Sequence, residues 1–327
     1  MKPIIKVRVD SNELIGLGHL FRTISIAQIL VNDFDFHFFV KSQATIDKLI
    51  NYSFDFTLIS SDKEFLIKLC NNDIVLLDGY EFKTDFERKI KLIGCFLICI
   101  DDLNDHHFYA DIIINHGSHF TSNDFYIQSY TKLYLGLKYI LVRPAFLSQC
   151  NSQFIDRQNL NSVFLSFGGA SNIEIIKSAI SVFEFLNFNV INIVFGNNSD
   201  AKSVLSLNSP NLKCFSNLNS NQIVELIHKS DLAFVPASTI ILESFCVGIP
   251  IISGWVYQNQ NHSLSEYESN GLIINLGDLS TNLEEKLLSV FESVSIEKFN
   301  SLARNQKKMI FDSRDNIKEI FNNAANR

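Results

Sequence analysis

Short apolar runs alternate with helical patterns along most of this chain of 327 residues. The runs are rich in β-branched and aromatic side chains, which is typical of buried strands. Alternation of this kind predicts parallel sheets covered by helices on both faces, an α/β fold. In the first half the expected strands are Ile4–Val9, Phe34–Val40, Phe56–Ile59, Ile74–Leu77, Phe96–Ile100, Ile112–Asn115 and Tyr134–Leu135, and the expected helices are Leu20–Val31, Ala44–Asn51, Lys63–Cys70 and Asp85–Ile93.

The pattern lapses between about residues 148 and 160 into a polar, aperiodic segment and then restarts. We therefore expect an N-terminal α/β domain over residues 1–148, a second α/β domain over residues 160–295 and a C-terminal helix over residues 296–327. Two doubly wound, Rossmann-like domains facing each other across a cleft are the predicted architecture. In the second half the expected strands are Ser162–Phe167, Val190–Phe195, Leu212–Phe215, Leu232–Val235 and Ile249–Ser253, and the expected helices are Ile173–Leu186 and Asn221–His228, the latter capped by Asn219 or Ser220.

Composition excludes several classes of protein. A content of 46% hydrophobic and 19% charged residues describes a folded globular chain. The formal charge of −7, without a basic tract, disfavours a nucleic-acid partner. No apolar run has the length of a membrane span and no signal peptide is evident, so we expect a cytoplasmic protein without membrane insertion. The six cysteines form no Cys-x-x-Cys pair, and we expect neither a metal nor another cofactor.

The corner between the first strand and the first helix runs from Asp10 to Arg22. Its glycines, Gly16 and Gly18, allow close approach of the backbone to a ligand, and the helix start favours an anion. His19 follows directly and can exchange a proton near neutral pH. The dinucleotide fingerprint requires a third glycine where Phe21 stands, which disfavours NAD.

Polar residues also follow three later strands of the first half. They are Asp78-Gly79-Tyr80, Asp101-Asp102 and Asn115-His116-Gly117. Each alone is an ordinary cap or turn sequence. Because ligands of parallel sheets bind at the carboxyl ends of the strands, their recurrence predicts a site at this edge.

The second half offers two further places for a phosphate. One is the glycine corner of residues 168–171, and the other is the helix start at Ser238-Thr239. Neither has the lysine of a P-loop, so a clamp for triphosphate hydrolysis is not indicated. Glu243 lies one turn beyond Thr239 among apolar neighbours, where a carboxylate needs a partner such as ribose hydroxyls. Together these features predict a bound nucleoside diphosphate.

These motifs, taken in order, resemble a known family. The matching pieces are Asp10-Ser11, Ile15-Gly16-x-Gly18-His19-x-x-Arg22, Leu77-Asp78-x-Tyr80, Asp101-Asp102, Asp111 to Asn115, Gly136 to Phe146, Phe167-Gly168-Gly169, Ala237-Ser238-Thr239 with Glu243, and Asn259-Gln260. They are similar to the hydrolases of pseudaminic acid biosynthesis that release UDP from UDP-2,4-diacetamido-2,4,6-trideoxy-β-L-altropyranose. That family is related to the GT-B glycosyltransferases of the lipid II type, so the resemblance implies a GT-B-like fold.

The resemblance also implies roles for individual residues. His19 corresponds to the general base that activates water, without a metal or a covalent intermediate. Tyr80 and the Asp101-Asp102 pair line the sugar side, Gly169 and Ser238-Thr239 hold the diphosphate, Glu243 accepts from ribose, and Asn259 contacts sugar or phosphate. The substrate contacts expected in full are Asp10, Gly18, Arg22, Tyr80, Asp102, Gly169, Ala170, Ser238, Thr239, Glu243, Asn259 and Gln260.

Three alternatives remain open at this point. A glycosyltransferase on the same scaffold would need an acceptor before it released UDP. A hydrolysing UDP-sugar 2-epimerase would invert carbon two of the sugar. A nucleotide-sugar-binding subunit without activity would function without His19. We expect a UDP-sugar as the binding partner and no obligate protein partner.

Overall fold

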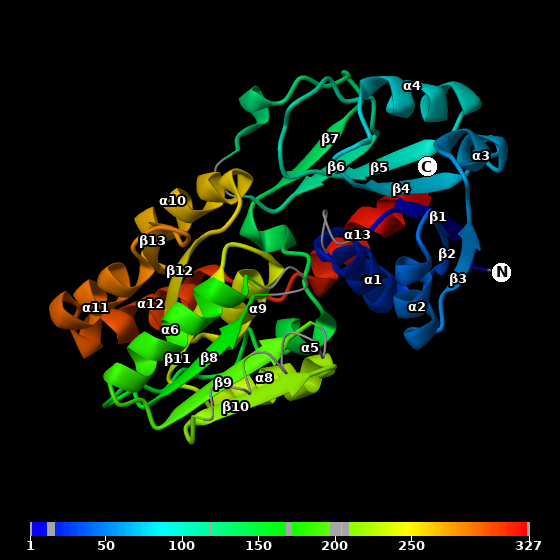
Figure 1. The fold of residues 1–327 in the computed structure, drawn as a ribbon. Coiled ribbons are helices and arrows are strands. Elements are labelled where there is room, and N and C mark those ends of the chain that lie inside the picture. The colour runs from blue at the N-terminus through cyan, green and yellow to red at the C-terminus, as the bar shows by residue number, and fades with distance from the viewer. Residues whose placement is uncertain are drawn as a thin grey trace. The chain divides into compact units, whose positions relative to one another are not determined.

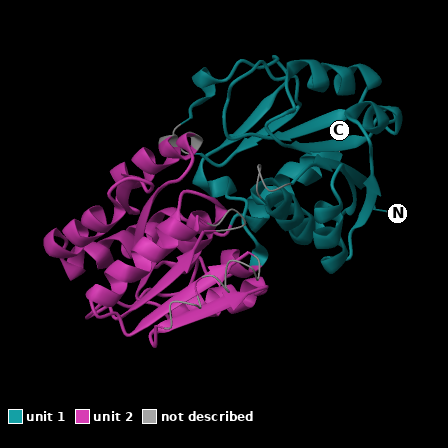
Figure 2. Ribbon diagram, viewed as in Figure 1, with its two compact units in different colours: residues 1–144, 313–327 teal, residues 145–312 magenta. Residues whose placement is uncertain are grey.

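The fold is that of a computed structural model, which describes residues 2–11, 17–117, 120–167, 172–196, 204 and 209–325, with the side chains of Asn259 and His262 left out. The chain divides into two compact units (Figure 2). Unit 1 comprises residues 1–144 and 313–327, and unit 2 comprises residues 145–312. Each unit is an α/β domain built on one parallel sheet.

Unit 1 contains a seven-stranded sheet in the order β3-β2-β1-β4-β5-β6-β7, in which every neighbouring pair is parallel (Figure 1). The order starts in the middle at β1 and reverses beside it, so ligand-binding loops meet at the carboxyl ends of β1 and β4. Its strands are β1 (Ile4–Val9), β2 (Asp35–Val40), β3 (Asp55–Leu58), β4 (Ile74–Asp78), β5 (Phe96–Ile100), β6 (Ile112–Asn115) and β7 (Lys132–Leu135). Its helices are α1 (Gly18–Leu30), α2 (Gln43–Asn51), α3 (Asp62–Ile67), α4 (Thr84–Ile93) and α13 (Arg314–Ala325), with 3-10 turns η1 (Ser122–Asp124) and η2 (Leu137–Tyr139).

Strand β4 lies in the core of unit 1. All five β4 residues are buried, as expected for a strand covered by helices on both faces. Val75 and Leu77 pack on one face with Phe65 of α3 and Ile90 of α4. Such a strand has no exposed face for a charge, so the terminal Asp78 must find partners inside the protein.

Unit 2 contains a six-stranded parallel sheet in the order β10-β9-β8-β11-β12-β13. Its central strand β11 is again buried throughout. The strands are β8 (Ser162–Ser166), β9 (Val190–Phe195), β10 (Leu212–Ser216), β11 (Leu232–Pro236), β12 (Ile251–Trp255) and β13 (Ile274–Asp278). The helices are α5 (Pro144–Leu147, which begins at the last residue of unit 1), α6 (Ile173–Phe185), α8 (Ser220–His228), α9 (Thr239–Val247), α10 (Asn261–Ser269), α11 (Leu283–Ser293) and α12 (Ile296–Met309), with the 3-10 turn η3 (Gln258–Gln260).

The expected single helix over residues 296–327 is two helices. Ile310 is extended, with φ −103° and ψ 123°, and ends α12. The buried Ser313 Oγ donates a 2.6 Å hydrogen bond to the carbonyl of Ile140. Through this break α12 stays in unit 2, whereas α13 joins unit 1, where Phe321 packs against Phe34 beside α1.

The other expected elements are confirmed to within about two residues at either end, except that helix α3 ends at Ile67, short of the expected Cys70. Asn219 is the N-cap of α8, as one of the two alternatives had it. Strand β13 and helix α10 were not expected. The sequence of β13 contains Asn, Gly and Asp, which are depleted in strands. None of the helices within the described ranges combines the length and the apolar character that crossing a bilayer requires.

Candidate functional site

His19 is the second residue of α1 and is only 5% exposed. Its Nδ1 lies 2.6 Å from Oδ1 of Asp78. Two neighbours contact Nδ1. The carboxylate of Asp78 can only accept and favours a proton on Nδ1, with Nε2 basic, whereas Nη2 of Arg22, 2.9 Å from Nδ1, can only donate and favours the opposite tautomer. Within the described residues no hydrogen bond involves Nε2. The ring is therefore oriented and holds a nitrogen that can accept a proton.

Asp78 is the residue that assembles this site. It ends β4, pairs in register with Val9 at the end of β1 and is completely buried. Besides His19 it accepts two hydrogen bonds of 2.6 Å from Arg22, Nη2 to Oδ1 and Nε to Oδ2. The sequence placed Asp78 at a strand end but gave it no role. The sequence feature that could have indicated its role is a carboxylate at the end of an apolar strand, because a carboxylate is costly to bury without such partners.

Arg22 links Asp78 to Asp102, which follows β5. Its Nη1 lies 2.7 Å from both carboxylate oxygens of Asp102. Burial alone would raise the pKa of Asp102, but the charge of Arg22, with smaller effects of His116 and His19, lowers it to about 2. Asp102 is thus a fixed negative charge held by an arginine that is itself buried.

The ring of Tyr80 packs against the ring of His19. The ring centroids are 4.5 Å apart and the planes are nearly perpendicular, at 86°. Burial, with a further contribution from Asp102, raises the pKa of Tyr80 well above its ordinary value. The phenol is neutral at neutral pH and can donate a hydrogen bond to a ligand.

The two aspartates after β5 have different environments. Asp101 is 8% exposed and accepts from the amides of Leu103 and Asn104 and from Asn115 Nδ2. It stabilises the turn, and burial followed by repulsion from Asp102 raises its pKa. Of the pair, Asp102 is the one that contacts Arg22.

His116 lies next to this network, and no role was predicted for it from the sequence. Its Nε2 lies 3.9 Å from Oδ1 of Asp102, at the end of β6. Burial lowers its pKa, which favours a neutral ring. Its Nδ1 is buried and has no hydrogen-bond partner in the described part of the chain. The sequence feature that could have indicated His116 is the loop motif Asn115-His116-Gly117, which follows a strand.

Asp10 and Gly18 lie at the same edge of the sheet. Both oxygens of Asp10 are already bonded, one to Nη2 of the buried Arg8 at 2.5 Å and one to the amide of Lys41 at 2.8 Å. Asp10 therefore stabilises the carboxyl ends of β1 and β2. Gly18 is the first residue of α1 and precedes His19 directly.

In unit 2 the predicted nucleotide residues gather on α9, which follows the buried strand β11. Ser238 is its N-cap, and its side chain makes no capping hydrogen bond in the described structure. Thr239 is the first helical residue, and Glu243 is 2% exposed one turn later. The free hydroxyl and the positive end of the helix suit an anion.

Gln260 lies in η3, where its Oε1 accepts from the amides of Val256 and Tyr257 at 2.9 and 3.2 Å. Gly169 and Ala170 lie outside the described residues, as does the side chain of Asn259. In the described ranges no group of three or more His, Cys, Asp or Glu side chains is arranged to hold a metal ion.

No protein-family model matches the chain. Over 272 residues it is 26% identical to the uncharacterized protein MJ1062 of Methanocaldococcus jannaschii, covering 78% of this chain and 56% of that protein. Over 220 residues it is 20% identical to the spore coat polysaccharide biosynthesis protein SpsG of Bacillus subtilis, covering 64% of each. The chain thus spans less than two thirds of the length of either relative.

Three solved structures share the whole fold. MurG of Acinetobacter baumannii is 11% identical with a TM-score of 0.68, covering 98% of this chain and 99% of that one. The spinosyn rhamnosyltransferase SpnG, complexed with thymidine diphosphate, is 12% identical with a TM-score of 0.65, covering 95% and 98%. A candidate UDP-N-acetylglucosamine 2-epimerase of Listeria monocytogenes is 11% identical with a TM-score of 0.57, covering 98% and 95%. The chain therefore has the two-domain α/β fold of the GT-B glycosyltransferases.

Proposed function

We propose that this protein hydrolyses a UDP-linked 2,4-diacetamido-2,4,6-trideoxy sugar and releases UDP and the free sugar for the synthesis of a nonulosonic acid of the pseudaminic type. The observation that carries the proposal is the 2.6 Å contact between His19 Nδ1 and Asp78 Oδ1. With the proton on Nδ1 and accepted by Asp78, Nε2 is the base in a nearly buried ring, which is the arrangement that activation of a water molecule needs.

In the proposed reaction, water attacks the anomeric carbon. The new C–O bond forms as the bond to the diphosphate breaks, and UDP departs with the electron pair. His19 Nε2 takes the proton of the water, and Asp78 stabilises the resulting imidazolium. Tyr80, Arg22, Asp102 and Gly18 would contact the sugar side, with Asp10 supporting the strand ends.

The nucleotide would bind to unit 2. Ser238 and Thr239 at the start of α9, with Gly169 and Ala170, would hold the diphosphate, and a helix N-terminus stabilises the charge that develops on it. Glu243 would accept from the ribose, and Asn259 and Gln260 would complete the contacts. The likeness to a rhamnosyltransferase complexed with thymidine diphosphate supports a nucleotide ligand for this fold.

Two alternatives follow from the structural likenesses. The match to MurG favours a glycosyltransferase, and the match to the candidate 2-epimerase favours a hydrolysing epimerase. A transferase would release UDP only with an acceptor present, and an epimerase would give a product inverted at carbon two.

The test is UDP release from the purified protein without an acceptor. Wild-type protein and His228→Ala, which removes an exposed histidine of α8, should release UDP at equal rates. His19→Ala should lose this activity by at least about 10²-fold while it keeps its affinity for UDP. UDP release that requires an acceptor, or that survives in His19→Ala, would overturn the proposal.

A further inference from the structure

A second group of buried ionisable side chains lies in unit 1, outside the network of His19. Its centre is Glu87 of α4, which is 1% exposed. Oε1 of Glu87 lies 3.0 Å from Nε2 of His106 and accepts from the thiol of Cys99 at 3.5 Å. Oε2 accepts from the amide of Tyr109 at 2.5 Å. None of these groups has a role in the reaction proposed above.

One cavity touches both groups. His19, Tyr80 and Asp102 contribute to its wall, and so do Glu87, Cys99 and His106. Its volume is ≈ 20 Å³, enough for about one water molecule. Carboxylate, imidazole and phenol groups around a space of this size are suitable partners for such a molecule.

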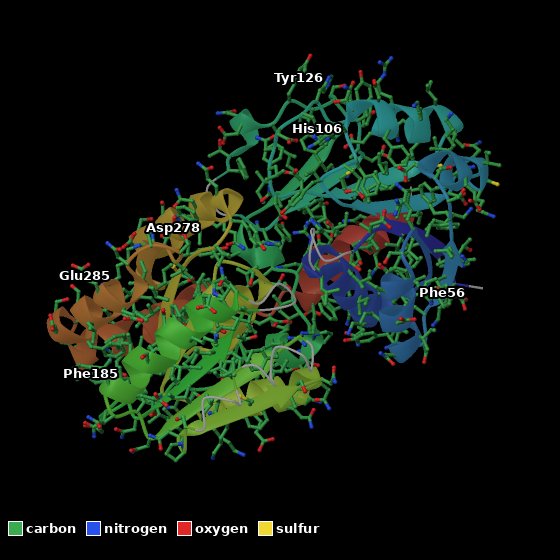
Figure 3. The ribbon with its side chains drawn as sticks, in the orientation of Figure 1. Phe56, His106, Tyr126, Phe185, Asp278 and Glu285 are labelled. Carbon is green, nitrogen blue, oxygen red and sulfur yellow. The ribbon has the colours of Figure 1, made fainter. Side chains whose placement is uncertain are left out.

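His106 contributes to the wall of this cavity and lies on the segment after β5, where Figure 3 labels it. Its Nδ1 lies 3.0 Å from Oδ1 of Asp105, whose side chain is 43% exposed and pairs with Lys83. Burial lowers the pKa of His106, but the hydrogen bonds to Glu87 and Asp105 and the charge of Glu87 outweigh burial and raise it. His106 can therefore carry a proton at neutral pH.

The proposed hydrolysis produces one proton that must leave in every turnover. The oxygen of water goes to the anomeric carbon, UDP leaves as an anion, and the proton remains on His19. His19 is only 5% exposed and packs against Tyr80, so its direct contact with solvent is small.

We propose that Glu87 and His106 form a proton relay that carries this proton through the cavity to Asp105 and solvent. Glu87 receives the proton from the cavity and passes it to Nε2 of His106, whose Nδ1 proton then leaves on the Asp105 side. A turn of the imidazole ring restores the starting tautomer before the next turnover. No oxidant, reductant or co-reactant is needed. This inference rests on the proposed hydrolysis, but it concerns proton export and not the attack on the sugar.

Histidine variants and small buffers test the relay. His106→Phe should lower kcat for UDP release about tenfold in dilute buffer, with KM unchanged, and added imidazole should restore kcat. Glu87→Gln should show the same loss. His107→Phe is the matched control. The ring of His107 stacks on that of Tyr126, with the ring centroids 3.7 Å apart, and does not contribute to the cavity.

A purely structural role would lower kcat without any recovery in imidazole. His106→Gln provides a second variant in case phenylalanine prevents folding. Wild-type kcat in both His106 variants, or a loss that imidazole does not restore, would overturn the relay alone. A wild-type protein that releases no UDP would overturn the proposed function, and the relay with it.

Discussion

His19 and Asp78 are 59 residues apart in the chain, yet a single 2.6 Å hydrogen bond joins Nδ1 of the one to Oδ1 of the other in the interior of unit 1. Parallel pairing of β1 with β4 brings the two loops together, because both strands end at the same edge. The contact with Asp78 favours the tautomer that has the proton on Nδ1, against the contact of the same nitrogen with Nη2 of Arg22.

Asp78→Asn should therefore lower kcat for UDP release by about 10²- to 10⁴-fold, since an amide can donate to Nδ1 and favour the wrong tautomer. The affinity for UDP should not change, because the nucleotide is proposed to bind to unit 2. Steady-state kinetics together with UDP titration would measure both. A variant that is folded and retains nearly wild-type kcat would show that Asp78 does not orient the base.

Arg22→Lys should destabilise the protein by about 2 kcal/mol or more, because lysine cannot replace four hydrogen bonds from one planar fork to two carboxylates. The free energy of unfolding from urea titration is the measurement. Arg88→Lys is the control, since Arg88 is exposed on α4 and should change stability little. Equal stability of both variants would contradict the network.

Much of the fold could be predicted from the sequence because buried parallel strands are continuous apolar runs. β1, β5, β6 and β9 begin and end at the expected residues. The prediction of strands and helices failed where the local composition does not indicate the element that packing stabilises. The strand β13 contains Asn275, Gly277 and Asp278, and the break between α12 and α13 depends on a contact between Ser313 and the distant Ile140.

Asp102 should make stability depend on acidic pH. Its pKa in the folded protein is about 2, below the ordinary value of about 4 for an unfolded chain. A carboxyl group whose pKa is lower in the folded than in the unfolded chain stabilises the fold at pH values above its unfolded pKa. This contribution is lost as the pH falls through its folded pKa. The shift corresponds to about 2 kcal/mol at neutral pH.

The comparison of wild type with Asp102→Asn measures this contribution. The difference between their free energies of unfolding should be about 1 kcal/mol smaller at pH 3 than at pH 7, because the variant no longer titrates there. Chemical denaturation at both pH values would provide the data. A difference that is constant over this range would mean that Arg22 does not hold Asp102 in its ionised form.

Ser238→Ala should weaken UDP binding about fivefold with little loss of stability, because the hydroxyl caps no helix N–H and is proposed to bind the diphosphate. Asn219→Ala is the matched control at another N-cap of unit 2. Asn219 forms a capping box with Gln222, so its loss should cost about 1 kcal/mol without changing UDP affinity. Calorimetric titration and thermal unfolding separate the two effects, and an unchanged Kd in Ser238→Ala would contradict the proposed role.

The site was predictable only in part. The sequence placed His19, Tyr80 and Asp102 at strand ends that share one edge of a sheet, and the structure brings them together around Arg22. The partners of Asp78 and His116 depend on side-chain directions across the sheet, which spacing along the chain does not determine. Asp10 was expected as a substrate contact from its place at a strand end, and its bonds to Arg8 and Lys41 could not be predicted from that place.

The most direct test follows the products of the UDP-linked diacetamido trideoxy sugar in ¹⁸O-labelled water, with wild type, His19→Ala and His228→Ala. Proton NMR reports the sugar, and mass spectrometry reports the label in UDP. We expect free UDP without the label and a reducing sugar of unchanged carbon-two configuration, formed by wild type and His228→Ala and absent with His19→Ala. Label in the β-phosphate of UDP, an inverted carbon two, or equal turnover by His19→Ala would contradict attack of His19-activated water on the anomeric carbon.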